Sequence, residues 1–247
     1  MRCRIAVIAA MERELKPLIQ GWALNTIRIG ERSLLCYERN DVVAIFCGMG
    51  RERAEQAARA VVEQYRPQIL VSAGVAGALI RSLKPGSMVL PNVIVDAATG
   101  VEYRCEVGGD VVGGGVLVTT FEIANTRSKA ELVDCFHALV VDMEAAAIAK
   151  VAMESGLWFR CVKTIADEFE FAMPPLAPFV DYEGYFDEAR FARWIAVRPR
   201  HWLPVIRLAR DTGKAVRALC DWLDKNLGEN LQAAKVVTLN GAEYLKN

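Results

Sequence analysis

The sequence predicts an α/β fold, in which buried strands alternate with helices along a chain of 247 residues. The clearest signal is the stretch 138–168, where an apolar run at 139–141 leads into a helical pattern and then into a second strand over 158–165. Apolar strand-like runs at 4–10 and 68–79 repeat this theme, and 53% of the residues are hydrophobic. Such a chain is long enough to bury a substantial core, as one large domain or as two small ones.

Composition and charge argue against several classes of function. Lysine plus arginine equals aspartate plus glutamate at 30 each, so no basic excess favours a nucleic-acid partner. The seven cysteines include no C-x-x-C pair and there are two histidines, which indicates free thiols in a reducing compartment and no zinc site. No run of 18 apolar residues is present, so we expect a cytoplasmic protein without a membrane span, a metal or another cofactor.

Acidic residues follow both strands of the stretch 138–168. Asp142 and Glu144 come where the first strand ends, and Asp167 ends the second strand. We expect these strands to form a right-handed parallel crossover, and ligands bind at the carboxyl ends of the strands in open parallel sheets. The sequence therefore predicts two or three carboxylates at one crevice. For Glu144 an alternative stays open, because an acid at a helix N-terminus also offsets the helix dipole.

Two more strand ends carry residues suited to a ligand. Glu12 and Glu14 lie at the start of a helix that we expect from residue 11 to about residue 19, although they could serve only the helix dipole. The sequence CGMGR then places Gly50 directly before a helix predicted over 51–65. Glycines at this position let backbone amides approach an anion or a polar ligand.

Several motifs together resemble one family. The run VVDMEAAAIA, followed by KTIADE, resembles the signature of the purine nucleoside phosphorylase / uridine phosphorylase superfamily. The opening AAMERELKPL and the glycine motif with Gly74 and Gly77 extend the match over residues 3–168, closest to the methylthioadenosine / S-adenosylhomocysteine nucleosidases. The resemblance implies a single domain over 1–227, with a mixed central β-sheet flanked by helices. It also implies a homodimer, in which a neighbouring subunit often completes the pocket.

The resemblance also implies roles for individual residues in cleaving an N-glycosidic bond. Asp167 would protonate the purine at N7, and an aspartate here favours adenine or another purine over uracil. Glu144 would accept hydrogen bonds from the ribose hydroxyls, Glu14 would orient the attacking water, and Phe121 would either lie on the purine or belong to the core. The implied catalytic residues are Asp167 and Glu14, and the implied substrate-binding residues are Glu144, Met143, Phe121, Gly74 and Gly50.

The glycine motif bears on whether water or phosphate attacks the sugar. Phosphorylases of this superfamily usually carry an arginine at the start of the glycine motif and a hydroxyl residue after its first glycine. This chain has Ser72 and Val75 at these places, and valine cannot donate a hydrogen bond to phosphate. We therefore expect water as the nucleophile. Phosphate stays open, because Arg51 could bind it unless that side chain is simply solvated.

Residues 169–204 depart from the small nucleosidases, because they are dense in aromatic residues and prolines. They resemble the hopanoid-associated "phosphorylase" branch, whose members are thought to remove adenine from adenosylhopane. We expect either a lid over the 5′ end of the nucleoside or an element that covers the core or a dimer face. The segment includes an amphipathic helix over 183–196, and a longer helix follows over 200–227. Residues 228–247 form a weakly structured tail with a short strand at 235–239.

The sequence therefore predicts a nucleosidase that releases adenine from a 5′-modified adenosine, with a small-molecule nucleoside as its partner. Two alternatives remain open. One is a phosphate-dependent phosphorylase, which would be a transferase. The other is a non-catalytic nucleoside-binding protein, although a binder needs no carboxylate to activate water. A dinucleotide-binding protein is disfavoured, since no G-x-G-x-x-G turn follows the first strand.

Overall fold

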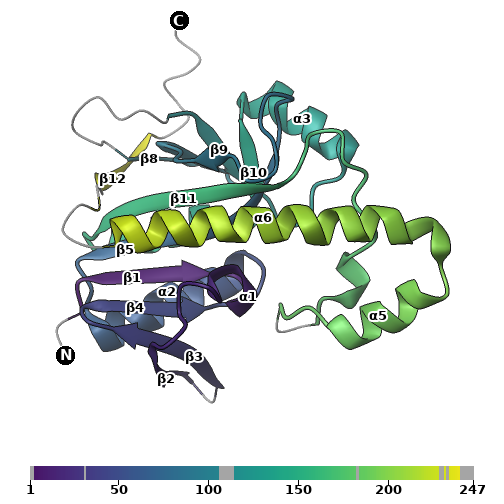
Figure 1. Cartoon of the computed structure of the whole chain (residues 1–247). Coiled ribbons are helices and arrows are strands. Elements are labelled where there is room, and N and C mark those ends of the chain that lie inside the picture. Colours follow the sequence, from purple (N-terminus) through teal and green to yellow (C-terminus); the bar gives the residue numbers. More distant parts are fainter. Residues whose placement is uncertain are drawn as a thin grey trace, which may run out of the picture.

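One mixed sheet organises the chain in the computed structural model, which describes residues 3–30, 32–105, 114–181, 184–227, 231 and 234–239 (Figure 1). Its twelve strands follow the order β2-β3-β4-β1-β5-β10-β9-β7-β8-β12-β11-β6. Because β11 also pairs with β5, the strands from β5 to β11 in this order close into a ring. The strands are β1 (Ile5–Ala9), β2 (Ala23–Ile29), β3 (Arg32–Arg39), β4 (Val42–Phe46), β5 (Ile69–Ala78), β6 (Met88–Val89), β7 (Val93–Asp96), β8 (Glu102–Cys105), β9 (Val116–Thr119), β10 (Val140–Asp142), β11 (Trp158–Asp167) and β12 (Ala234–Leu239).

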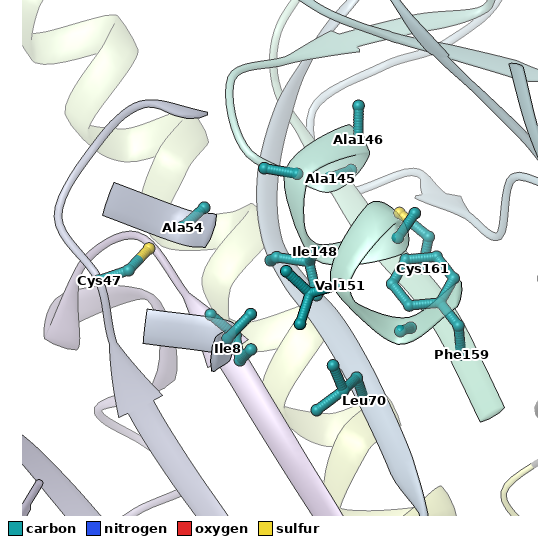
Figure 2. Packing of buried hydrophobic residues seen from close by; sticks show 14 of the residues in the cluster. Ile8, Cys47, Ala54, Leu70, Ala145, Ala146, Ile148, Val151, Phe159 and Cys161 are labelled. Atoms are coloured by element: carbon teal, nitrogen blue, oxygen red, sulfur yellow. The ribbon is translucent and has the colours of Figure 1, made fainter. Parts of the chain in front are cut away.

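Helices cover both faces of this sheet and create two large cores, with a smaller third cluster under the helix at 126–136. The α-helices are α1 (Glu12–Leu15), α2 (Arg51–Tyr65), α3 (Thr126–Phe136), α4 (Ala145–Glu154), α5 (Glu188–Ala196) and α6 (Trp202–Asn226), with 3₁₀ turns η1 (Ala177–Phe179) and η2 (Pro199–His201). Helices α2 and α4 pack on one face, where small alanines let them approach closely, and Figure 2 shows Ile148 and Val151 of α4 beside Leu70 of β5. The other core joins α1 and α6 through Leu15, Leu219 and other buried residues.

Most predicted elements are present with nearly the predicted bounds. The helix over 51–65 is α2, and the apolar runs at 4–10 and 68–79 are β1 and β5, which are almost fully buried as parallel neighbours. Residues 23–39 form the hairpin β2–β3, which turns at Gly30 with φ of 59°. One prediction was wrong in detail, because the helix expected to reach about residue 19 is the single turn α1.

The expected parallel crossover is also wrong, and the actual topology creates the site. Strand β10 is antiparallel to β5, whereas β11 is parallel to β5, so β10 and β11 run in opposite directions. Strand β1 pairs with β5 as far as Ser72, and β10 pairs with the same strand at Gly77 and Ala78. The carboxyl ends of β1 and β10 therefore face each other across the short interval of β5 between these residues. The residues that follow both strands meet there, beside the end of β11.

The aromatic segment after β11 has a small core of its own. Phe179 makes edge-on contacts with Phe186, Phe191 and Trp194, at ring-centroid distances of 6.4, 5.1 and 5.5 Å. The predicted helix over 183–196 is α5, which begins at Glu188. Figure 1 shows α5 and the first half of α6 beyond the edge of the sheet, while the second half of α6 packs on the strands.

The C-terminal strand completes the ring of strands. Strand β12 pairs with β8 and β11, in agreement with the short strand expected at 235–239. Most of the tail predicted to be weakly structured lies outside the described residues. Within the part of the chain that the structure describes, no helix has the length and apolar character needed to cross a membrane.

Candidate active site

A cavity of about 150 Å³ lies where β1, β5, β10 and β11 end. Its polar lining residues are Glu14, Thr120, Glu122, Lys129, Asp142, Glu144 and Asp167. A second cavity of about 520 Å³ lies beside it, and both are bordered by Met49, Glu122, Ile123 and Met143. We call these the inner cavity and the outer cavity. The three carboxylates to which the resemblance gives roles, those of Glu14, Glu144 and Asp167, all line the inner cavity.

Glu14 lies on α1, directly after β1, and is only 3% exposed. Its carboxylate accepts hydrogen bonds from the amide of Met11 at 3.1 Å and from the amide of Val75 at 3.4 Å. A Cβ at Gly74 would lie 3.4 Å from Glu14 Oε2 and 3.6 Å from Lys163 Nζ, so this part of β5 lies directly against both groups. Burial raises the pKa of Glu14, and the nearby amides and Lys163 partly offset that effect.

Glu144 faces the same space from the start of α4. Its Oε1 accepts a hydrogen bond from the amide of Gly50 at 2.8 Å, and its Oε2 accepts one from the amide of Met143 at 3.3 Å. Gly50 has a φ of 101°, a conformation that suits glycine and aims its N–H at Glu144. Burial and the neighbouring carboxylate of Asp142 together raise the pKa of Glu144 to about 7, against the opposing effects of Lys163 and the Gly50 amide. Glu144 therefore changes charge near neutral pH in the ligand-free protein.

Asp167 ends β11 and pairs with a lysine that the sequence did not reveal. Lys129 of α3 donates from Nζ to Asp167 Oδ2 at 2.5 Å and to the carbonyl of Glu168 at 2.8 Å, and its side chain is 1% exposed. A Cβ at Gly77 would lie 3.2 Å from Asp167 Oδ2, so glycine favours this close approach. Burial raises the pKa of Asp167, while Lys129 acts in the opposite direction.

The side chain of Asp142 borders the cavity, but its carboxylate is bound to neighbouring groups of the protein. Its carboxylate accepts hydrogen bonds from Thr119 Oγ1 at 2.7 Å and from the amide of Ala145 at 2.9 Å, which caps the first turn of α4. It also forms a buried ion pair with Lys163 Nζ at 2.8 Å. Burial alone would lower the pKa of Lys163, but Asp142 and Glu144 raise it overall. Lys163 is therefore a buried cation among the carboxylates of the site, and it too was not predicted.

The outer cavity is bordered by Phe121, which is 60% exposed, so the alternative that this ring belongs to the core is wrong. The guanidinium of Arg51 lies 5.7 Å from the centre of the Phe121 ring. Arg51 is bound to the buried carboxylate of Asp96 through two contacts, at 2.5 and 2.8 Å. The expectation of a merely solvated Arg51 is therefore wrong, and its charge is already paired.

The start of the aromatic segment contributes to both cavities. Met173 borders the inner cavity, whereas Ala177, Val180 and Gly184 border the outer one. Gly184 packs directly on the loop before α2, because its carbonyl accepts a hydrogen bond from the amide of Met49 at 2.8 Å. Among the described residues, α5 contributes no side chain to the lining of either cavity.

The chemistry available at the inner cavity follows from these environments. Three buried carboxylates have raised pKa values, and each is held by backbone amides or by a lysine. Such groups are suited to proton transfer and to binding hydroxyl groups near neutral pH. The exposed Phe121 ring offers a flat apolar surface in the adjoining outer cavity.

Comparisons with known proteins agree with the motifs and the fold. Residues 4–110 match the profile of the phosphorylase superfamily. The 5′-methylthioadenosine/S-adenosylhomocysteine nucleosidase of Geobacillus sp. (strain WCH70) is 27% identical over 198 residues, which are 66% of this chain and 85% of the relative. The enzyme of the same name from Shewanella oneidensis is 25% identical over 221 residues, which are 76% and 92% of the two chains.

Solved structures share the architecture at lower sequence identity. The 5′-methylthioadenosine/S-adenosylhomocysteine nucleosidase of Neisseria meningitidis, in complex with methylthio-immucillin-A, aligns with a TM-score of 0.67 at 17% identity and covers 92% of this chain and 99% of its own. The futalosine hydrolase of Helicobacter pylori aligns with a TM-score of 0.63 at 17% identity and covers 91% and 99%. These similarities confirm the predicted single mixed sheet flanked by helices.

Proposed function

Because residues 4–110 match the phosphorylase superfamily and the relatives described above are nucleosidases, we propose that this chain hydrolyses the N-glycosidic bond of a 5′-modified adenine nucleoside and releases adenine. The observation that carries this proposal is the convergence of Glu14, Glu144 and Asp167 on one buried cavity. The relatives that match most of this chain are nucleosidases for 5′-methylthioadenosine and S-adenosylhomocysteine, which supports an adenine nucleoside as the substrate.

In the proposed reaction, the bond between C1′ of the ribose and N9 of adenine breaks, and its electron pair leaves with the base. Asp167 donates a proton to N7 as negative charge develops on the adenine. Water attacks C1′ of the oxocarbenium-like sugar, and Glu14 orients this water and accepts its proton. Glu144 accepts hydrogen bonds from the 2′- and 3′-hydroxyls, with Met143 against the sugar and Phe121 against the base. Gly50 and Gly74 let the backbone come close to these groups.

Water is favoured over phosphate as the nucleophile by the charges around the cavity. The amide of Val75 is directed to Glu14 and its side chain offers no donor. Arg51 is bound to Asp96, and Lys129 is bound to Asp167. These cations are thus neutralised by carboxylates rather than free to bind an anion.

The 5′ substituent is proposed to be large and apolar, as in adenosylhopane. The aromatic segment borders the outer cavity through Ala177, Val180 and Gly184. Met49 and Ile123 add apolar side chains to this lining, which also includes charged residues. A substituent that leaves the inner cavity would enter this space. The segment 169–204 would then act as a fixed wall over the 5′ end, with its aromatic cluster behind it.

The first experiment follows adenine release from 5′-methylthioadenosine with and without inorganic phosphate. We expect adenine and the free sugar at a rate that does not depend on phosphate. A sugar 1-phosphate would instead show the phosphorolytic alternative. Binding of the nucleoside without release of adenine would support a non-catalytic binding protein.

A series of substrates tests the 5′ substituent. Adenosine, 5′-methylthioadenosine and 5′-alkyl adenosines of increasing length should be cleaved with increasing kcat/KM if the outer cavity accepts an apolar chain. Equal kcat/KM values across the series would contradict the proposed preference.

We also propose a homodimer, for which sedimentation velocity should give twice the 27.3 kDa mass of the chain.

A further inference from the structure

A projecting arm is formed by residues 187–210, which comprise α5, η2 and the first turns of α6 (Figure 1). Four large apolar side chains on this arm are exposed: Val197 by 73%, Trp202 by 47%, Leu203 by 79% and Ile206 by 62%. Trp202, Leu203 and Ile206 lie on adjacent positions of one helical face. Single exposed apolar residues are common on proteins, but a cluster of this kind marks an interaction surface.

The exposure of these residues does not come from a poorly packed arm. The inward aromatic residues, Phe179, Phe191 and Trp194, contact one another. Trp202 donates from its indole nitrogen to the carbonyl of Ile195 at 2.9 Å, which fixes the junction between α5 and α6. The arm therefore has an inner aromatic core and a separate outer apolar face.

The arm is strongly basic, although the whole chain has a formal charge of zero. Between Ala189 and Arg210 there are six arginines and no aspartate or glutamate. Arg207 and Arg210 reach acids outside this interval, notably Asp211. The other arginines in the interval are Arg190, Arg193, Arg198 and Arg200. Among the described residues, none of these four has a carboxylate within salt-bridge distance.

We propose that this arm is a docking surface for a membrane that contains anionic lipids. Trp202, Leu203 and Ile206 would enter the boundary between headgroups and acyl chains, as the apolar face of an interfacial helix does. The arginines around them would bind lipid phosphates, for which the guanidinium geometry is well suited. Apolar and basic groups in one helical arm match a negatively charged surface with an apolar interior.

A second copy of this chain fits the surface less well. A two-fold contact through the same face would bring the arginines of one arm against those of the other, and like charges opposed across an interface are unfavourable. Nucleic acid would satisfy the arginines but leave Leu203 and Ile206 in water. The charge pattern therefore favours the anionic lipid surface.

The position of the arm indicates how docking would serve the reaction. This step rests on the proposed apolar 5′ substituent. The chain that leads into the arm contributes Ala177, Val180 and Gly184 to the outer cavity. A docked arm would thus hold the outer cavity close to the lipid surface, where a nucleoside with a long apolar tail resides. Docking itself does not depend on the substrate and can be tested without it.

The test measures sedimentation of the full chain with vesicles of phosphatidylcholine alone or with about 30% phosphatidylglycerol. We expect binding to the anionic vesicles only, and weaker binding when salt rises from about 0.1 M to about 1 M, because screening shortens the reach of the arginines. The variant Leu203→Glu/Ile206→Glu should bind at least about tenfold more weakly. Leu24→Glu changes an apolar residue that is 61% exposed on β2 and is the matched control, with wild-type binding expected.

Two results would overturn the proposal. One is a folded wild-type protein that fails to bind anionic vesicles at low salt. The other is an arm variant that binds these vesicles as well as the wild type. Sedimentation velocity on the same variants tests whether the arm instead joins two copies of the chain. A wild-type dimer that becomes a monomer in Leu203→Glu/Ile206→Glu would show that the arm is an interface between copies. Turnover of 5′-methylthioadenosine in solution should be unchanged in the arm variant, so failure of docking and failure of the proposed reaction are distinguishable.

Discussion

Lys129 Nζ lies 2.5 Å from Oδ2 of Asp167, and both side chains are buried at the end of the inner cavity. This contact changes the expected behaviour of the proposed acid. Burial among apolar residues favours a protonated Asp167, whereas Lys129 stabilises its carboxylate. The ability of Asp167 to donate a proton is therefore set by the balance between these two effects.

Replacing Lys129 should move the pH dependence of the reaction. A proton donor must be protonated, so kcat/KM falls as the pH rises through its pKa. Lys129→Met removes the cation that lowers the pKa of Asp167, and the falling limb should shift to higher pH. Lys129→Arg retains the charge and should leave this limb near its wild-type position. An unchanged limb in Lys129→Met would show that Lys129 does not control the acid.

Asp167→Asn should lower kcat by about 10²- to 10⁴-fold, because an amide cannot donate the proton that N7 requires. The effect on KM should be small, since the amide keeps the size of the side chain and its acceptor for Lys129. Steady-state kinetics with 5′-methylthioadenosine and circular dichroism of the variant provide the measurement. Near wild-type turnover by a folded variant would remove Asp167 from the role of acid.

Glu144 should produce the rising limb of the same profile. Its pKa of about 7 means that it becomes a carboxylate, the better acceptor for ribose hydroxyls, only as the pH rises through neutrality. We therefore expect kcat/KM to increase between about pH 6 and pH 8. The variant Glu144→Gln should lose this limb together with most of its activity. A limb that persists in Glu144→Gln would belong to another group.

The same residue should destabilise the free protein at higher pH. A carboxyl group whose pKa is raised on folding binds its proton more tightly in the native state, so stability is lost as the pH rises from the ordinary value of 4.5 to about 7. The loss is on the order of 3 kcal/mol. Glu144→Gln should consequently be more stable than the wild type at pH 8 and similar to it at pH 4. Urea unfolding at the two pH values is the measurement, and equal differences at both would contradict the assignment.

The sequence predicted the carboxylates of this site better than the cations that hold them. Glu14, Glu144 and Asp167 are visible because each follows an apolar strand, and strand ends border a cavity in this sheet. Lys129 lies in a mostly polar helix, where nothing in the periodicity distinguishes a buried lysine from a solvated one. Its burial depends on how α3 packs over the end of β11, which is a property of tertiary structure.

The topology was predicted in part for a similar reason. The alternation of strands and helices indicates the α/β class, but the direction of a three-residue strand such as β10 is not encoded in its apolar pattern. That direction depends on pairing with the far end of β5. The carboxylates meet as predicted, but the prediction rested on a parallel crossover from β10 to β11, and these two strands run in opposite directions. The ends of β1 and β10 instead meet head to head along β5.

The buried pair of Lys163 and Asp142 should matter for stability. Lys163→Met leaves a buried carboxylate without its cation and should cost about 3–5 kcal/mol of unfolding free energy. The double variant Lys163→Met/Asp142→Asn removes both charges and should recover a large part of this loss. Arg127→Met is the matched control, because Arg127 pairs with Glu131 on the surface and should change stability by less than about 1 kcal/mol. Additive effects of the two single changes would show that the pair is not coupled.

Gly184 provides the most direct test of how the aromatic segment supports the site. Its φ is 76°, and a Cβ at this position would lie 2.5 Å from the carbonyl oxygen of Met49. Gly184→Ala should therefore push the segment away from Met49. The residue after Met49 is Gly50, whose amide donates a hydrogen bond to Glu144. We expect kcat/KM to fall by about 10- to 100-fold, because small displacements of binding groups have effects of this size.

The control for this change is Gly100→Ala. Gly100 has a similar φ of 70° but no atom within 4 Å of its Cβ position, so it carries the same backbone cost without the contact to Met49. Both variants should lose about 1–2 kcal/mol of stability from the positive φ. Only Gly184→Ala should lose activity. If both lose activity equally, backbone strain alone explains the effect, and the aromatic segment does not position the loop before α2.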